Sequence, residues 1–159
     1  MRVKYIADET FQDYKKPAML ISAIGCTWKC LTELGLDTSI CQNCELAKSK
    51  TIDMDDDLIV ERYMNNPITS AIVFGGLEPI LQLDEVKSLV GKFRKKTKDD
   101  IVIYTGYYLY EIYEDVIWFR KYKNIIFKFG RFIPNSPSHY DSVLGIELIS
   151  YNQHAIKIS

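Results

Sequence analysis

The sequence predicts an α/β protein built on a mostly parallel β-sheet. Short apolar runs alternate with amphipathic stretches, and crossovers of about twenty residues or more are long enough to carry helices between parallel strands. A glycine also follows each run, and because glycine has no side chain, a ligand can approach the backbone closely at the edge of the sheet. These strands are expected at residues 18–24, 70–74, 100–105 and 124–129, followed by Gly25, Gly75, Gly106 and Gly130.

Helices are expected between these strands. Residues 53–66 carry aspartates near their start, where negative charge suits the helix dipole, and Pro67 ends the helix. Residues 83–95 place four apolar side chains on one face at helical spacing and become basic toward their end. The remaining elements are a helix within residues 109–120, short strands at residues 1–6, 143–149 and 154–158, and an irregular segment at residues 134–137.

Composition narrows the class of protein. A chain of 159 residues with 47% hydrophobic side chains is expected to form one domain, residues 1–159, with a sizeable core. The formal net charge of -1 provides no electrostatic case for direct nucleic-acid binding or for an anionic membrane partner. No apolar run is long enough to span a membrane, and the N-terminus lacks a secretory signal, so a cytoplasmic location is expected.

All four cysteines lie within residues 25–44, which we call the cysteine segment. Three, ten and two residues separate them in turn. Thiolates are soft ligands that select zinc, copper(I) or iron-sulfur clusters, and a reducing compartment disfavours disulfides. Two hypotheses stay open from the spacing: a structural zinc on all four thiols, or an iron-sulfur cluster on three of them.

A second motif follows the second predicted strand. It consists of Gly75, Gly76, Glu78 and Pro79, with Leu77 as a one-residue insertion. Together with the spacing of Cys26 and Cys30, this order of motifs on these elements resembles the radical S-adenosylmethionine enzymes, which pair a CxxxCxxC loop with a GGEP-like turn.

The resemblance implies a [4Fe-4S] cluster on three thiolates, with S-adenosylmethionine at the open iron and the glycine turn beside its methionine end. Cys41 is expected to be the third ligand, since the family's third cysteine is commonly followed by one residue and an asparagine, as in Cys41-Gln42-Asn43. Cys44 is the alternative third ligand. Residues 31–40 would then be an insertion looped out of the cluster-binding turn.

Within this superfamily the chain resembles the activating proteins of anaerobic ribonucleoside-triphosphate reductase. Three later segments support the likeness: residues 103–107 (IYTGY), 128–132 (KFGRF) and 150–156 (SYNQHAI). The likeness implies that Thr105 and Asn152 lie around the bound S-adenosylmethionine. It also implies a partial, open (β/α) barrel of the radical S-adenosylmethionine type, with the cluster at the carboxyl ends of the strands.

The implied activity is reductive cleavage of S-adenosylmethionine to a 5′-deoxyadenosyl radical, which generates a glycyl radical on a partner enzyme. The expected partners are the large subunit of an anaerobic ribonucleotide reductase and an electron donor such as flavodoxin or ferredoxin. No catalytic side chain is expected beyond the cofactor site, and His139 and His154 are interpreted as surface residues. The alternatives are a radical S-adenosylmethionine enzyme with another peptide or small-molecule substrate, and a non-enzymatic four-cysteine zinc module.

Overall fold

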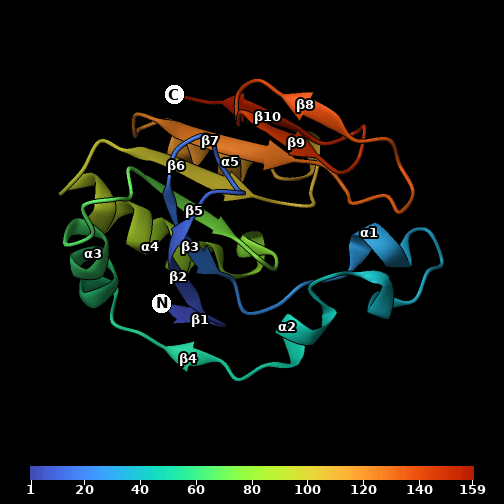
Figure 1. The fold of residues 1–159 in the computed structure, drawn as a ribbon, viewed down its shortest axis with the longest axis horizontal. Helices are drawn as coiled ribbons and strands as arrows, with labels where there is room; N and C mark the ends of the chain where they lie inside the picture. Colours follow the sequence, from blue (N-terminus) through green and yellow to red (C-terminus); the bar gives the residue numbers. More distant parts are fainter.

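A computed structural model describes residues 1–159, and a six-stranded sheet forms its centre (Figure 1). The strand order is β10-β7-β6-β5-β3-β2. The bounds of the strands are β2 (Ile6–Thr10), β3 (Ala18–Ser22), β5 (Ala71–Gly75), β6 (Asp100–Tyr104), β7 (Ile125–Phe129) and β10 (His154–Lys157). The four central strands run parallel, while β2 and β10 pair antiparallel at the two edges. The predicted α/β fold with a mostly parallel sheet is therefore confirmed.

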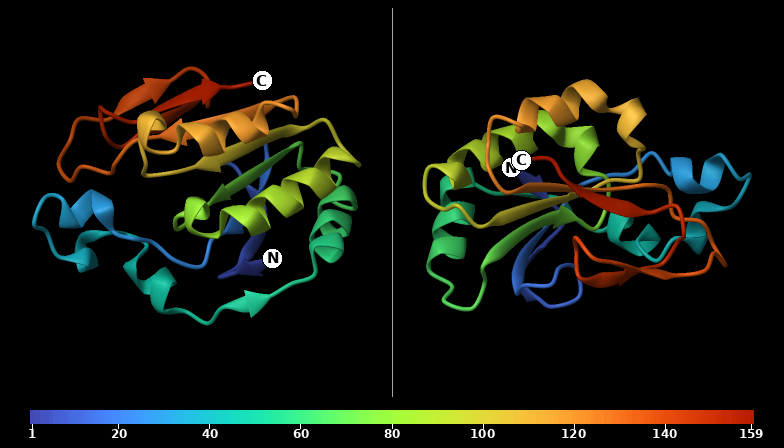
Figure 2. Two further views of the ribbon diagram at one scale, coloured as in Figure 1. Left: turned by 180° about the vertical axis from the view of Figure 1, so that it is seen from behind. Right: turned by 90° about the horizontal axis from the view of Figure 1, so that it is seen from above.

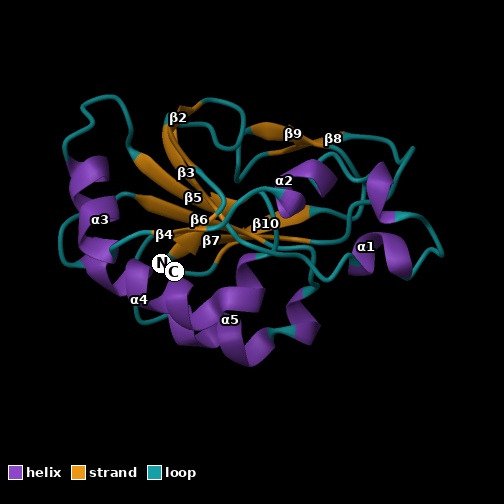
Figure 3. Ribbon diagram, turned by 90° about the horizontal axis from the view of Figure 1, so that it is seen from below, coloured by secondary structure: helices purple, strands orange, loops and turns teal.

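Three helices connect the parallel strands, and all lie along one face of the sheet (Figure 3). They are α3 (Asp56–Met64), α4 (Leu83–Arg94), which follows the short helix η2 (Pro79–Gln82), and α5 (Tyr113–Phe119), which follows η3 (Leu109–Glu111). In α4 the four apolar residues at helical spacing are buried, as their periodicity predicted: Val86, Leu89, Val90 and Phe93. None of the helices combines the length and hydropathy that a membrane crossing requires.

A hairpin of β8 (His139–Asp141) and β9 (Ile146–Leu148) covers part of the opposite face (Figures 2 and 3). Its Leu144 and Leu148 join a second apolar cluster with inward side chains of the parallel strands. In the register of the sheet, Tyr104 on β6 lies opposite Lys128 on β7, beyond this cluster toward the carboxyl ends of the strands. On this face the apolar cluster therefore gives way to polar side chains toward the carboxyl ends of the strands.

The N-terminal strand differs from the prediction. Residues 1–6 do not form one edge strand: β1 (Arg2–Val3) pairs with β4 (Ile52–Asp53), and the edge of the main sheet is β2. The terminal amine of Met1 donates to the Met54 carbonyl at 2.6 Å and forms an ion pair with Asp56 at 2.7 Å. These long-range contacts hold β1 beside β4.

The C-terminal half also differs in detail. The predicted strand at residues 143–149 shortens to β9, and β8 was not predicted. The reason is Asp141, whose Oδ1 accepts the N–H groups of Val143 and Leu144, at 2.9 Å each. The next residue, Gly145, has φ +72°. The apolar residues at 143 and 144 therefore belong to the hairpin turn rather than to a strand.

Candidate metal centre

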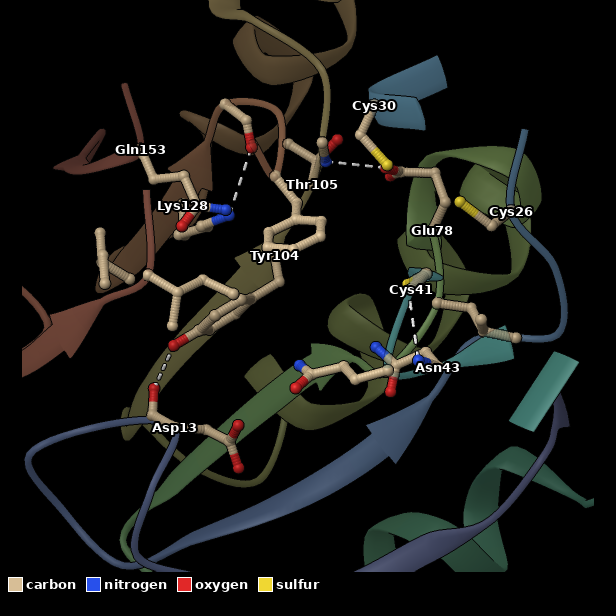
Figure 4. Close-up of a pocket in the computed structure, with 18 of the residues that line it drawn as sticks. Asp13, Cys26, Cys30, Cys41, Asn43, Glu78, Tyr104, Thr105, Lys128 and Gln153 are labelled. Carbon is tan, nitrogen blue, oxygen red and sulfur yellow. Dashed lines mark hydrogen bonds between the residues drawn. The ribbon is translucent and has the colours of Figure 1, made fainter. Parts of the chain in front are cut away.

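The cysteine segment extends from the end of the sheet toward which the parallel strands run (Figure 1). It contains two short helices, α1 (Lys29–Thr32) and η1 (Thr38–Ile40), and its last residue begins a third, α2 (Cys44–Lys48). Cys26 precedes α1, Cys30 lies within it, and Cys41 follows η1. These three cysteines line one cavity of about 520 Å³ at the carboxyl ends of the strands. Their sulfur atoms gather on one side of the cavity, around Glu78 (Figure 4).

Cys44 has a different environment from the other three. It is the first residue of α2, is not among the residues that line the cavity, and places its Sγ 3.6 Å from the Glu45 carboxylate. Cys41 follows η1, whereas Cys44 begins α2 directly after Asn43, so the two thiols have different surroundings. The four thiols do not converge, and no group of three or more His, Cys, Asp or Glu side chains is arranged to hold a single metal ion.

Backbone groups are already directed at two of the cavity sulfurs. The Trp28 N–H donates to Cys26 Sγ at 3.3 Å, and the Asn43 N–H donates to Cys41 Sγ at 3.4 Å. Trp28 adopts φ 57°, an uncommon conformation for a bulky residue, which turns the chain back toward Cys26. Hydrogen bonds of this kind favour the charged form of sulfur that binds iron.

Burial has the opposite effect, because it favours the uncharged form of the free thiols. Desolvation raises the pKa of Cys26 to about 11 and also raises the pKa of Cys30. The free thiols of Cys26 and Cys30 are therefore protonated at neutral pH, and metal binding to them is coupled to proton release. Three separate thiols on one wall of a cavity, two of them with N–H donors, fit a multi-iron cluster, in which each thiolate would bind a different iron. They do not form the tetrahedral four-thiolate set of a structural zinc.

The turn after β5 forms the adjacent wall of the cavity. Gly76 and Glu78 line it, whereas Gly75 and Pro79 do not. The Glu78 side chain is buried and accepts the Gly106 N–H at 2.8 Å and the Ile80 N–H at 3.2 Å. Burial raises the pKa of its carboxyl. The Glu78 N–H donates to the Gly25 carbonyl at 2.8 Å, so Glu78 joins this turn to the cysteine segment and to the end of β6.

The residues predicted around S-adenosylmethionine have different positions. Thr105 lines the cavity and accepts the Tyr107 N–H at 3.0 Å. Asn152 is not in the lining: its amide donates to the Tyr108 hydroxyl and to the Arg131 carbonyl, at 3.0 Å each, while its buried Oδ1 has no partner. The next residue, Gln153, lines the cavity instead.

Lys128 is a cavity residue that the sequence interpretation missed. Its side chain is almost fully buried and makes one hydrogen bond, to the Gly130 carbonyl at 3.3 Å (Figure 4). Burial lowers the pKa of its ammonium group to about 8. The available signal was a single charged residue inside the apolar strand NIIFKF, since lysine is rarely buried unless it is paired.

The chain was compared with known proteins and families. A sequence model of a family described as a 4Fe-4S single cluster domain matches residues 19–142. This range contains all four cysteines, the turn after β5 and Lys128. No curated protein matches the chain, and no solved structure matches it.

Proposed function

The chain belongs to the family of 4Fe-4S single cluster domains, and from that premise we propose that Cys26, Cys30 and Cys41 hold a [4Fe-4S] cluster. We further propose that the protein is a radical S-adenosylmethionine enzyme. Three protein thiolates would leave one iron open to a ligand, and a reduced cluster would supply the electron for cleavage of the sulfonium bond. The observation that carries the proposal is that the three thiols and the turn at Gly76 and Glu78 line the same cavity.

The chain's own residues have distinct roles in this proposal. The three thiolates bind the cluster, and the backbone at Gly76 allows a ligand to approach the sheet edge closely. Glu78 holds the turns around the cavity together and presents a carboxylate to a ligand amine. Lys128 contributes the positive charge that suits a ligand carboxylate. Trp28 and residues of the β8–β9 hairpin form further walls of the cavity.

We propose that the substrate is a glycine of a partner glycyl-radical enzyme, with the large subunit of an anaerobic ribonucleotide reductase as first candidate. The support is the sequence resemblance and the open sheet, which ends in two antiparallel edge strands and leaves the cavity reachable from outside. A flavodoxin or ferredoxin is the proposed electron donor. Attack on another peptide or on a small metabolite is the second candidate, favoured by the extension of the cavity to Gln12 and Asp13.

Anaerobic reconstitution with iron and sulfide tests this function. The protein is then reduced with dithionite in the presence of S-adenosylmethionine, and 5′-deoxyadenosine is quantified. Formation of 5′-deoxyadenosine only when cluster, reductant and cofactor are all present supports the radical class. A brown protein that forms none overturns the S-adenosylmethionine chemistry and keeps the cluster. A colourless protein that retains stoichiometric zinc overturns both.

Replacing Lys128 with methionine is expected to stabilise the cluster-free protein while weakening the binding of S-adenosylmethionine. An ammonium buried without a carboxylate partner is destabilising, and a ligand carboxylate would supply the missing charge. The pKa falls from its ordinary 10.5 to about 8, which corresponds to a cost of about 3 kcal/mol at most. Urea unfolding of the two proteins and calorimetric titration with S-adenosylmethionine measure the two effects.

The pH dependence provides an internal check on Lys128. Its native pKa lies below its unfolded pKa, so between about pH 8 and pH 10.5 the unfolded chain holds more protons and the wild-type protein gains stability as pH rises. The advantage of Lys128→Met should therefore be full at pH 7 and shrink across that window. Lys50→Met, at an exposed loop position, is the control and should change neither quantity. Unchanged affinity in Lys128→Met would remove Lys128 from the ligand site.

A further inference from the structure

Arg131 is the buried centre of an ion-pair network beside the cysteine segment. Its guanidinium is 6% exposed and pairs with two carboxylates. Nε and Nη2 each donate to Glu33 at 3.0 Å, while Nη1 and Nη2 donate to Glu111 at 2.7 and 2.8 Å. Nη1 also donates to the Gly106 carbonyl at 2.5 Å. Two-pronged bonds of this kind are among the strongest that side chains make.

The network joins elements that are far apart in the sequence. Arg131 follows β7, Gly106 follows β6, and Glu111 lies in η3. Glu33 is the C-cap of α1, the single helical turn that carries Cys30. The loop after β6, the loop after β7 and the turn that carries Cys30 are therefore joined through one guanidinium.

A second contact holds the other side of the same turn. Lys29, the residue before Cys30, places its Nζ 2.7 Å from Glu111 Oε1 and 3.8 Å from Glu33 Oε1. The Arg131 and Lys29 bonds help to lower the pKa of Glu111 to about 2, so the network stays ionised at neutral pH. Its two cations and two carboxylates balance in charge.

The turn has few other anchors. Trp28, its N-cap, makes no side-chain capping bond, and Leu31 is the one buried residue of α1. The helix extends beyond the end of the sheet and does not pack along it (Figure 1). Arginine suits this task better than lysine, because its planar fork fixes direction as well as charge.

We propose that Arg131 is a positioning residue for the iron-sulfur cluster: it fixes the Cys30 turn through Glu33 and Glu111 and places its positive charge next to that turn. Two consequences follow. Fixing the turn slows loss of the cluster, and the nearby charge favours the reduced state, which carries one more electron. The inference needs the cluster of the family and not S-adenosylmethionine, so its tests omit that molecule and can fail independently of the radical chemistry.

The test compares the reconstituted full-length protein with Arg131→Gln, Arg131→Lys, Glu33→Gln and the control Arg120→Gln, which alters an exposed arginine at the end of α5. One readout is the rate at which a chelator removes the cluster, followed by its visible absorbance. The other is the reduced fraction at a fixed poised potential, taken from the EPR signal of the reduced cluster. Neither readout depends on enzymatic activity.

Arg131→Gln should lose its cluster about 10–100-fold faster, the range typical when a group that orients a metal ligand is removed. Its reduced fraction should fall, because a positive charge has left. Glu33→Gln should also lose the cluster faster, yet its reduced fraction should rise, because a negative charge has left. Arg131→Lys should keep most of the reduced fraction and recover only part of the retention.

Opposite changes in reduced fraction, with faster cluster loss in both variants, cannot come from a general loss of stability. If Arg131→Gln does not fold, Glu33→Gln and Arg131→Lys decide the matter, since the Glu33 side chain is 48% exposed and its replacement leaves the core intact. Wild-type rates and reduced fractions in Glu33→Gln and Arg131→Lys would overturn the proposal. So would an equal change in Arg120→Gln.

Discussion

Replacement of Cys26, Cys30 or Cys41 by alanine is expected to abolish the cluster, whereas Cys44→Ala retains it. The first three side chains line one cavity, and two of them accept backbone N–H bonds, while the Cys44 sulfur lies beside Glu45 outside that lining. A cluster held by only three protein thiolates has none to spare. Iron and acid-labile sulfide per chain after anaerobic reconstitution, together with the visible spectrum, measure the effect.

Cys44→Ala is the matched control, since it removes the same atoms from the same segment three residues away from Cys41. Loss of the cluster in Cys44→Ala, with retention in Cys41→Ala, would make Cys44 the third ligand. It would also require α2 to reorient when the cluster binds. Loss in all four variants, with one zinc per wild-type chain, would instead support a four-thiolate zinc site.

The parallel sheet could be predicted because its strands are local features of the sequence. Each is a short apolar run that ends near a glycine, and β3, β5, β6 and β7 lie at the predicted positions to within about two residues. The edge strands were harder to predict, because their positions depend on which strands pair with one another. Residues 1–6 have the composition of an edge strand, but the choice of β4 as the partner of β1 depends on Met54 and Asp56, some fifty residues away.

Some residues of the candidate site could likewise be predicted from local sequence, whereas others could not. The cysteines and the turn after β5 could be recognised because their chemistry is concentrated in short motifs. Lys128 could not be placed, because whether it faces the cavity or the helices depends on sheet register. Arg131, Glu33 and Glu111 form no local pattern: 98 and 20 residues separate the arginine from its two partners. Only folding brings such a network together.

The substitution Gly76→Val is expected to weaken S-adenosylmethionine binding while the iron content stays unchanged. Gly76 has φ +71°, and a Cβ there would lie 2.6 Å from Ser22 Oγ and 3.3 Å from Leu46 Cδ2. The turn must therefore shift at the cavity wall that Gly76 forms with Glu78. The three thiols lie on other segments, so the cluster itself should assemble.

The expected size of the effect follows from backbone strain. A side chain in this conformation costs about 1–3 kcal/mol, before any clash with Ser22 is counted. If this strain makes binding less favourable, each 1.4 kcal/mol lowers the affinity for S-adenosylmethionine about tenfold. A loss of affinity of about tenfold or more is therefore expected. Calorimetric titration of the reconstituted protein with S-adenosylmethionine, alongside iron analysis, separates ligand binding from cluster assembly.

Gly35 provides a matched control within the cysteine segment. It has φ +67°, close to that of Gly76, but a Cβ there would meet nothing within 4 Å. Gly35→Val therefore carries the same backbone strain without a clash at the cavity, and it should bind S-adenosylmethionine as the wild type does. Equal affinity losses in both variants would mean that strain alone acts. Unchanged binding in Gly76→Val would mean that Gly75 and Gly76 form an ordinary turn that does not contact S-adenosylmethionine. The second motif would then no longer support a radical S-adenosylmethionine enzyme.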